Sequence, residues 1–177
     1  MKLFFIACLA VLLTVPGFST IKSEASSPGE ESKAFPEIAL LTLDGKPVKQ
    51  TELKGEVYVV DFWATWCGPC LVEVPNFNAL QAKYADKGLK VLAVTMASGE
   101  AKEVVPFVTR YKMKYSVVMI QDEDNSPVAR DLDIMGFPTT FVVTKDWKIY
   151  KRYNGTSAKK MAQMEADIQN LLNAKAE

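Results

Sequence analysis

The sequence contains no histidine and only three cysteines among its 177 residues, and these shortages exclude several kinds of metal chemistry. A structural zinc site usually takes four cysteine or histidine ligands, and this chain has no second cysteine pair to complete one. An iron–sulfur cluster would need ligands borrowed from another chain. We therefore expect no resident metal or other cofactor. A carrier that holds a soft metal between two thiolates stays open as an alternative.

The chain also lacks net charge and repetitive sequence. Lysine plus arginine and aspartate plus glutamate both number 21, so the formal net charge is zero. Nucleic acids and anionic membranes favour proteins with a basic excess, so we expect no nucleic-acid partner and no electrostatic membrane contact. No internal repeat or low-complexity segment is present, and the length suits a single domain with one core.

One long apolar run is present, and it lies at the N-terminus. Lys2 precedes an almost unbroken apolar stretch over residues 3–15, which Pro16 and Gly17 interrupt. A short positive region followed by such a run is typical of a secretory signal peptide. The run is shorter than the ~20 residues of a transmembrane helix, which favours cleavage over an uncleaved membrane anchor. The weakest alternative is a lipoprotein modified at Cys8.

This interpretation divides the chain into three parts. Residues 1–25 are the predicted signal peptide, residues 26–34 a flexible lead-in, and residues 35–177 one globular domain of an exported protein. Removal of the signal peptide leaves only Cys67 and Cys70. Two cysteines three positions apart close too small a loop to stabilise a fold by much, which indicates a redox role for the pair.

Strand-like and helix-like patterns alternate along the predicted domain. A hairpin or two edge strands are expected over 35–43 and 46–53, on either side of an Asp-Gly turn. Periodicity then predicts further strands at 57–62, 89–95, 117–120, 139–143 and 148–153. It predicts helices at 71–84, within 100–113, from 127 to about 132, and after 156. This order indicates an α/β sandwich around a largely buried sheet that ends in an antiparallel pair.

The two cysteines fall between a predicted buried strand and a predicted helix. The first turn of a helix has unpaired N–H groups and the positive end of the helix dipole, so a cysteine there is stabilised as thiolate. The thiolate is the attacking species in disulfide exchange. We therefore predict Cys67 as the accessible nucleophile and Cys70, one turn further and more buried, as the resolving cysteine. Gly68 and Pro69 suit a first helical turn and leave the sulfur accessible.

At this point the sequence resembles a known family. The segment VDFWATWCGPC (residues 60–70) is similar to the active-site strand and loop of thioredoxin, as are Pro75 and the segment GFPTTF (residues 136–141). The wider layout resembles the exported TlpA/ResA-type branch of the thioredoxin superfamily. That layout is marked by FPE (35–37), DGK (44–46), LKG (53–55), EVP (73–75) and KGL (87–89). The resemblance spans roughly residues 35–155.

The resemblance implies a thioredoxin fold, in which a central mixed β-sheet is flanked by helices. To this it adds an N-terminal β extension and a central α-β insertion between residues 96 and 135. It also implies a cis peptide bond before Pro138, which would bring the backbone of Phe137 or Thr139 close to the sulfurs. Trp63 is expected in the core. The predicted substrate-binding residues are Trp66, Gly68, Pro69, Phe137, Pro138 and Thr139, with Trp66 and Phe137 forming an apolar rim.

Two acidic residues complete the predicted catalytic set with the cysteines. Asp61 matches the buried acid of thioredoxin, although the TlpA-type branch more often has asparagine there. Burial would raise the pKa of this carboxyl, so it could exchange a proton with Cys70; the alternative is a solvent-exposed acid at the strand end. Glu73 resembles the acid that the TlpA-type branch uses and lies one helical turn from Cys70, but a merely solvated glutamate is the alternative. The division of labour between the two acids stays open.

The expected function is an exported thiol–disulfide oxidoreductase that reduces disulfides of other exported proteins through a mixed disulfide. By resemblance, its electrons would come from a membrane-embedded thiol carrier, and its substrates would include cysteine-containing proteins such as apocytochrome c during cytochrome c maturation. A disulfide oxidant or isomerase is the main alternative. A peroxiredoxin lacks support, because its threonine and proline are absent from the required positions. A non-catalytic binding module would keep the fold without cycling the dithiol.

Overall fold

The computed structural model describes residues 33–53 and 55–174. The predicted signal peptide at 1–25, most of the lead-in and Lys54 of the LKG motif lie outside the described residues. Among those described, no helix is both long and apolar enough to cross a membrane.

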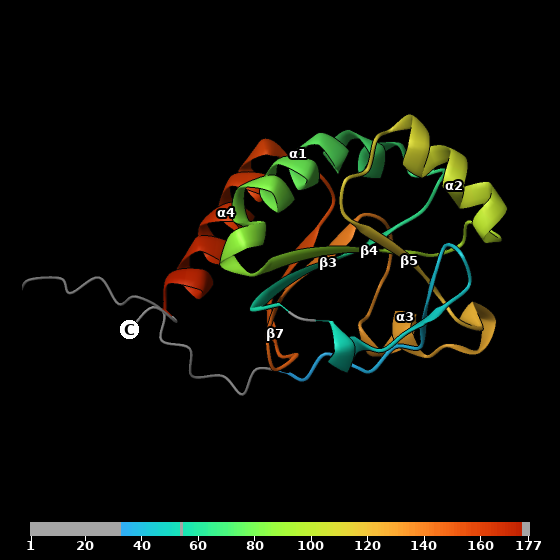
Figure 1. The fold of residues 1–177 in the computed structure, drawn as a ribbon, viewed down its shortest axis with the longest axis horizontal. Coiled ribbons are helices and arrows are strands. Elements are labelled where there is room, and N and C mark those ends of the chain that lie inside the picture. Colours follow the sequence, from blue (N-terminus) through green and yellow to red (C-terminus); the bar gives the residue numbers. More distant parts are fainter. Residues whose placement is uncertain (1–32, 54, 175–177) are drawn as a thin grey trace, which may run out of the picture. The chain divides into compact units, whose positions relative to one another are not determined.

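The described chain forms one mixed sheet with helices on both faces (Figure 1). The strands are β1 (Leu40–Thr42), β2 (Pro47–Val48), β3 (Val57–Trp63), β4 (Leu89–Thr95), β5 (Ser116–Ile120), β6 (Thr139–Thr144) and β7 (Ile149–Asn154). The helices are α1 (Gly68–Tyr84), α2 (Ala101–Arg110), α3 (Val128–Asp131) and α4 (Ala158–Asn173). Short 3-10 turns lie at Gln50–Glu52, Ala85–Lys87 and Glu123–Asn125. The expected α/β thioredoxin fold is confirmed.

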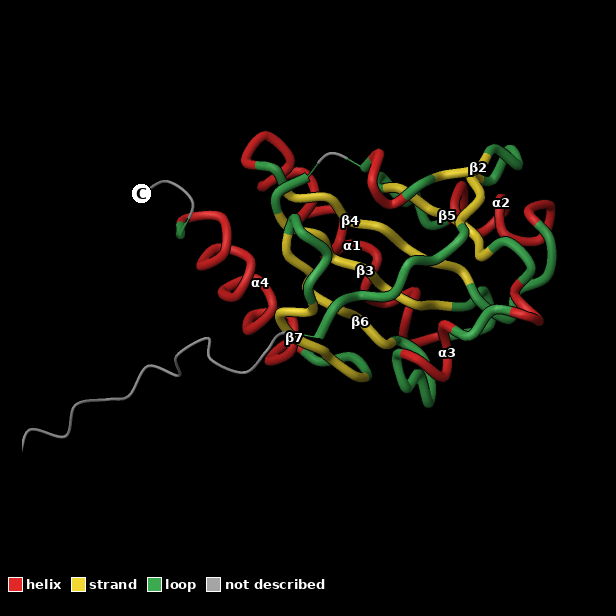
Figure 2. The backbone as a smooth tube through the Cα atoms, turned by 90° about the horizontal axis from the view of Figure 1, so that it is seen from below, coloured by secondary structure: helices red, strands yellow, loops and turns green. Residues whose placement is uncertain are grey.

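The sheet has the strand order β2-β1-β5-β4-β3-β6-β7, and the tube in Figure 2 shows its strands side by side. β3 pairs in parallel with β4 and antiparallel with β6, so it is a central strand with neighbours on both sides. Of the two predicted alternatives for the first strands, the hairpin is present: β1 pairs antiparallel with β2 and joins the sheet through β5. All seven residues of β3 are buried, which matches the continuous apolar run in the sequence.

Alternate residues of β3 enter different layers, as a period of two requires. Tyr58, Val60 and Phe62 pack in a cluster that includes Val128 and Leu132 around α3. The opposite face packs against α1, α2 and α4, which Figure 1 shows together above the sheet. Asp61 lies on this second face, so the strand carries the acid into the layer between the sheet and α1.

Helix α4 lies where the sequence predicts a helix after residue 156. The Ser157 hydroxyl caps the helix by accepting a hydrogen bond from the Lys160 backbone N–H at 3.0 Å. Met164 and Ile168 are fully buried against α1 and the sheet. Helix α2 begins at Ala101, within the predicted range 100–113, and Pro106 lies inside it.

Residues 33 and 34, at the end of the predicted lead-in, pair with the turn between β6 and β7. Ala34 forms a bridge with Lys148, and the Ile149 backbone N–H donates to the Lys33 carbonyl at 2.9 Å. Phe35 continues this pairing by donating its N–H to the Trp147 carbonyl at 2.7 Å. The pairing with the β6–β7 turn therefore includes residues 33 and 34 in the fold, a long-range contact that the polar local sequence did not indicate.

Candidate active site

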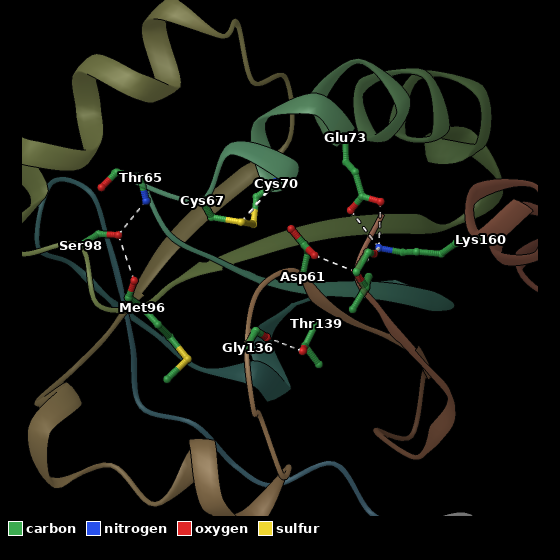
Figure 3. Close-up of a disulfide and its surroundings, with 12 residues drawn as sticks. Asp61, Thr65, Cys67, Cys70, Glu73, Met96, Ser98, Gly136, Thr139 and Lys160 are labelled. Carbon is green, nitrogen blue, oxygen red and sulfur yellow. Dashed lines mark hydrogen bonds and ion pairs between the residues drawn. A yellow bond between two sulfur atoms is a disulfide. The ribbon is translucent and has the colours of Figure 1, made fainter. Parts of the chain in front are cut away.

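Cys67 and Cys70 form a disulfide at the start of α1 (Figure 3). Cys67 is the N-cap residue of the helix, and its sulfur accepts a hydrogen bond from the Cys70 backbone N–H at 3.2 Å. This is the helix end at which the dipole and the free N–H groups stabilise negative charge. The geometry therefore favours a thiolate on Cys67 once the disulfide is reduced.

The expected contrast in exposure between the cysteines is absent from this oxidised form. Cys67 and Cys70 are both 4% exposed, whereas the sequence predicted an accessible Cys67 and a more buried Cys70. In this form the Cys67 sulfur is bonded to Cys70 and lies against the first turn of α1. Gly68 and Pro69, between the cysteines, are exposed.

The predicted apolar rim is present beside the disulfide. The Trp66 side chain is 66% exposed, and its ring centroid lies 5.7 Å from that of the half-buried Phe137. The Trp66 indole N–H donates to the Ala97 carbonyl at 2.7 Å. The Ser98 hydroxyl accepts from the Thr65 N–H at 2.9 Å, so the loop after β4 holds the loop before Cys67. The sequence did not predict these contacts, because they join two loops more than 30 residues apart and no local motif marks them.

The loop before β6 contains the expected cis peptide bond between Phe137 and Pro138. Thr139, whose backbone was predicted to approach a substrate, follows this bond as the first residue of β6. Its side chain is only 2% exposed, and its hydroxyl donates to the Gly136 carbonyl at 2.7 Å, while the residue pairs with both β3 and β7. Thr139 therefore supports the loop from inside the sheet. In the preceding Phe137–Pro138 pair, Phe137 is half-buried and Pro138 is buried.

Asp61 is buried, so the alternative of a solvent-exposed acid is wrong. It is 4% exposed, and in Figure 3 its carboxyl points toward the disulfide. Burial, with a smaller contribution from the neighbouring Glu73 charge, raises the pKa of Asp61 to about 7. The Thr140 hydroxyl, which donates to Asp61 Oδ1 at 2.8 Å, and the Lys160 ammonium oppose this rise in pKa. A carboxyl with this pKa can take up and release a proton near neutrality.

Glu73 is fully buried, so the alternative of a solvated helix acid is wrong as well. The Lys160 ammonium lies 2.9 Å from each of its carboxylate oxygens. The same ammonium donates to the Gly155 carbonyl at 2.6 Å and to the Thr140 hydroxyl at 3.3 Å. The two predicted acids thus belong to one network of polar side chains beneath the dithiol.

Sequence analysis missed three members of this layer: Lys160, Thr140 and Tyr115. Burial raises the pKa of Tyr115, and the charges of Asp61 and Glu73 raise it further, which places the phenol near both acids. A signal for Lys160 was present in the sequence. It precedes Met164 by four residues and Ile168 by eight, so it occupies the apolar face of α4. Within the described residues, no three histidine, cysteine, aspartate or glutamate side chains gather as a metal-binding group.

Comparisons with known proteins agree with this geometry. The Redoxin family model matches residues 30–172. The thioredoxin-like protein YneN of Bacillus subtilis is 33% identical over 141 residues, which cover 78% of this chain and 80% of that protein. The thiol-disulfide oxidoreductase ResA of B. subtilis is 29% identical over 170 residues, covering 93% and 89%. A crystal structure of a thiol:disulfide interchange protein from Chlorobium tepidum superposes with a TM-score of 0.66 at 26% identity, covering 81% of this chain and 98% of that one.

The fold, the helix-capping disulfide and these relatives define the class: the protein is a thiol–disulfide oxidoreductase of the ResA type, with Cys67 and Cys70 as its cysteine pair. The chain belongs to the Redoxin family.

Proposed function

We propose that this protein reduces disulfide bonds in other exported proteins. The observation that carries the proposal is the placement of Cys67 at the N-cap of α1, with the buried Asp61 carboxyl directed at the same disulfide. The Gly-Pro pair between the cysteines resembles that of thioredoxin, which favours a reductant over an oxidant. The apolar rim of Trp66 and Phe137 suits unfolded or partly folded polypeptides as substrates.

In the proposed cycle, the Cys67 thiolate attacks a substrate disulfide and forms a mixed disulfide. One substrate sulfur leaves as a thiolate and takes a proton from solvent. Asp61, in its ionised form, accepts the proton of the Cys70 thiol, and the Cys70 thiolate attacks the Cys67 sulfur. The second substrate sulfur then leaves. Two electrons have passed to the substrate, and the Cys67–Cys70 disulfide has formed.

The oxidised protein must be reduced again by a dithiol donor, for which we propose a membrane-embedded thiol carrier. This step needs an extracytoplasmic location, and residues 1–25 would supply it as a signal peptide or as an uncleaved anchor. Apocytochrome c is one candidate substrate, because its haem-attachment cysteines must be reduced before haem is attached. Other exported proteins with paired cysteines would present the same chemistry.

A trapping experiment tests this proposal. The variant Cys70→Ser, with Cys67 reduced, should accumulate a mixed disulfide with a model protein disulfide such as insulin, because no resolving thiol remains. Cys67→Ser should form no such adduct and should lose catalysis of insulin reduction. Reductase activity that survives Cys67→Ser would contradict the assignment of Cys67. Catalysis of disulfide formation in a reduced substrate, without catalysis of reduction, would favour an oxidant.

A further inference from the structure

The ion pair between Lys160 and Glu73 is almost fully removed from solvent. The Lys160 side chain is 6% exposed and the Glu73 side chain 0%. Burying both charges carries a desolvation cost that their mutual attraction does not always offset, so such a pair is weak evidence for stability alone. It also lies on the face of the sheet that carries the dithiol. We therefore ask whether the pair has a role in the redox reaction.

Thr140 connects the ion pair to Asp61. An ammonium group can only donate hydrogen bonds, so the Thr140 hydroxyl must accept from Lys160 in their 3.3 Å contact. The hydroxyl then has its single proton left for Asp61 Oδ1, 2.8 Å away. Lys160 therefore orients the hydroxyl so that it donates to Asp61.

The charged groups that face Asp61 come from several elements. Glu73 on α1 disfavours its ionisation, and Lys160 on α4 favours it. Tyr115, just before β5, lies within the range of the same charges. Cys70 follows on the first turn of α1. Lys160 contacts both Glu73 oxygens and the Thr140 hydroxyl, so it connects Glu73 to the residue that donates to Asp61.

We propose that Lys160 is a positioning residue of the redox reaction, which holds Glu73 as a fixed counter-charge and leaves Asp61 as the only acid that exchanges protons with Cys70. This proposal rests on the proposed function and deepens it, because it assigns different roles to the two acids. Glu73 takes no proton in the cycle. Its role is to hold the ammonium that orients Thr140.

Infrared spectroscopy of protonated carboxyl groups tests this assignment without relying on activity. In the wild-type protein one buried carboxyl should titrate near neutrality, and Asp61→Asn should remove that signal. Glu73→Gln should lower the midpoint by roughly one pH unit or more, because Asp61 loses a neighbouring negative charge and keeps the Lys160 ammonium. Lys160→Met should double the protonated-carboxyl signal, because an unpaired buried carboxylate takes up a proton.

Two further variants control the comparison. The double variant Glu73→Gln/Lys160→Met should show one titrating carboxyl, as the wild type does. If Lys160→Met does not fold, the double variant and Glu73→Gln still test the proposal. Lys83→Met breaks an exposed pair with Glu165 of similar length, 2.8 Å, and should leave the midpoint of Asp61 unchanged. A wild-type midpoint that persists in Glu73→Gln would overturn the proposal, as would an unchanged carboxyl count in a folded Lys160→Met.

The proposed function can fail separately. If the wild-type protein does not reduce insulin but the variants show the predicted shifts of carboxyl titration, the role of Lys160 stands and the reductase assignment is wrong. If the wild-type protein reduces insulin but Glu73→Gln does not shift the titration midpoint of Asp61, the proposed function stands and the proposed role of Lys160 is wrong. If Glu73 itself carried the proton, Glu73→Gln would remove the pH-dependent step of mixed-disulfide resolution, whereas we expect it to move that step to lower pH.

Discussion

Neighbouring residues on β3 enter two very different environments. Phe62 faces the layer around α3, where it belongs to an apolar cluster and its ring packs with those of Phe35 and Phe141. Asp61 faces α1 and α4, and all four of the buried charged side chains in the described residues lie on that face: Asp61, Glu73, Lys160 and Asp167. β3 therefore stabilises the fold through its apolar face, and its other face positions the Asp61 carboxyl beside the disulfide.

The largest expected loss of stability without a change in chemistry comes from the apolar face. Phe62→Ala removes a fully buried ring and should lower the free energy of unfolding by about 3–5 kcal/mol. Chemical denaturation would measure this loss. The titration midpoint of Asp61 in the folded variant should stay at its wild-type value, because Phe62 points away from it. A shifted midpoint would show that the two faces are coupled.

Asp61→Asn should raise the free energy of unfolding, by an amount that depends on pH. Burial raises the pKa of Asp61 from 3.8 to about 7, so the native state favours the neutral carboxyl. The stability that this preference contributes is fully present below pH 3.8 and is lost as pH rises through about 7. The asparagine variant does not lose this stability, and a shift of roughly three pKa units corresponds to about 4 kcal/mol.

Denaturation curves between acidic and mildly alkaline pH would test this prediction. The stability of Asp61→Asn relative to wild type should increase with pH and level off above the native midpoint. A constant difference across the range would mean that Asp61 titrates normally in the folded protein. The variant should also slow mixed-disulfide resolution, because Cys70 loses its proton acceptor.

The smallest effect is expected where a lysine–glutamate pair is exposed. Lys83→Met should change the free energy of unfolding by at most about 1 kcal/mol, since water already solvates both charges of the Lys83–Glu165 pair. Breaking the buried pair with Lys160→Met should cost about 3–5 kcal/mol, because it leaves Glu73 uncompensated. Thermal or chemical unfolding of the two variants side by side would measure this contrast. Equal losses would contradict the assignment of different environments to the two pairs.

The sequence predicted the elements best where local pattern and burial agree. The run at 57–62 became the central strand β3, and the Cys-Gly-Pro-Cys segment became the first turn of α1. Asp61 followed from the same run, because an acid within a buried strand must itself be buried. Lys160 was missed because its partner Glu73 lies 87 residues away, and a lysine in an amphipathic helix ordinarily faces solvent.

A further difference has the same physical origin in tertiary contact. Residues 33 and 34 look like a polar linker, yet they pair with the β6–β7 turn. Local sequence describes propensity along the chain, and this pairing has no local signature.

The most direct test of the proposed reductase function is the equilibrium reduction potential of the Cys67–Cys70 pair. It can be followed by tryptophan fluorescence in dithiol buffers of graded potential, since Trp66 and Trp63 lie beside the disulfide. We predict a strongly reducing value, near the roughly −270 mV of thioredoxin. A value near the roughly −120 mV of a strong disulfide oxidant would contradict it.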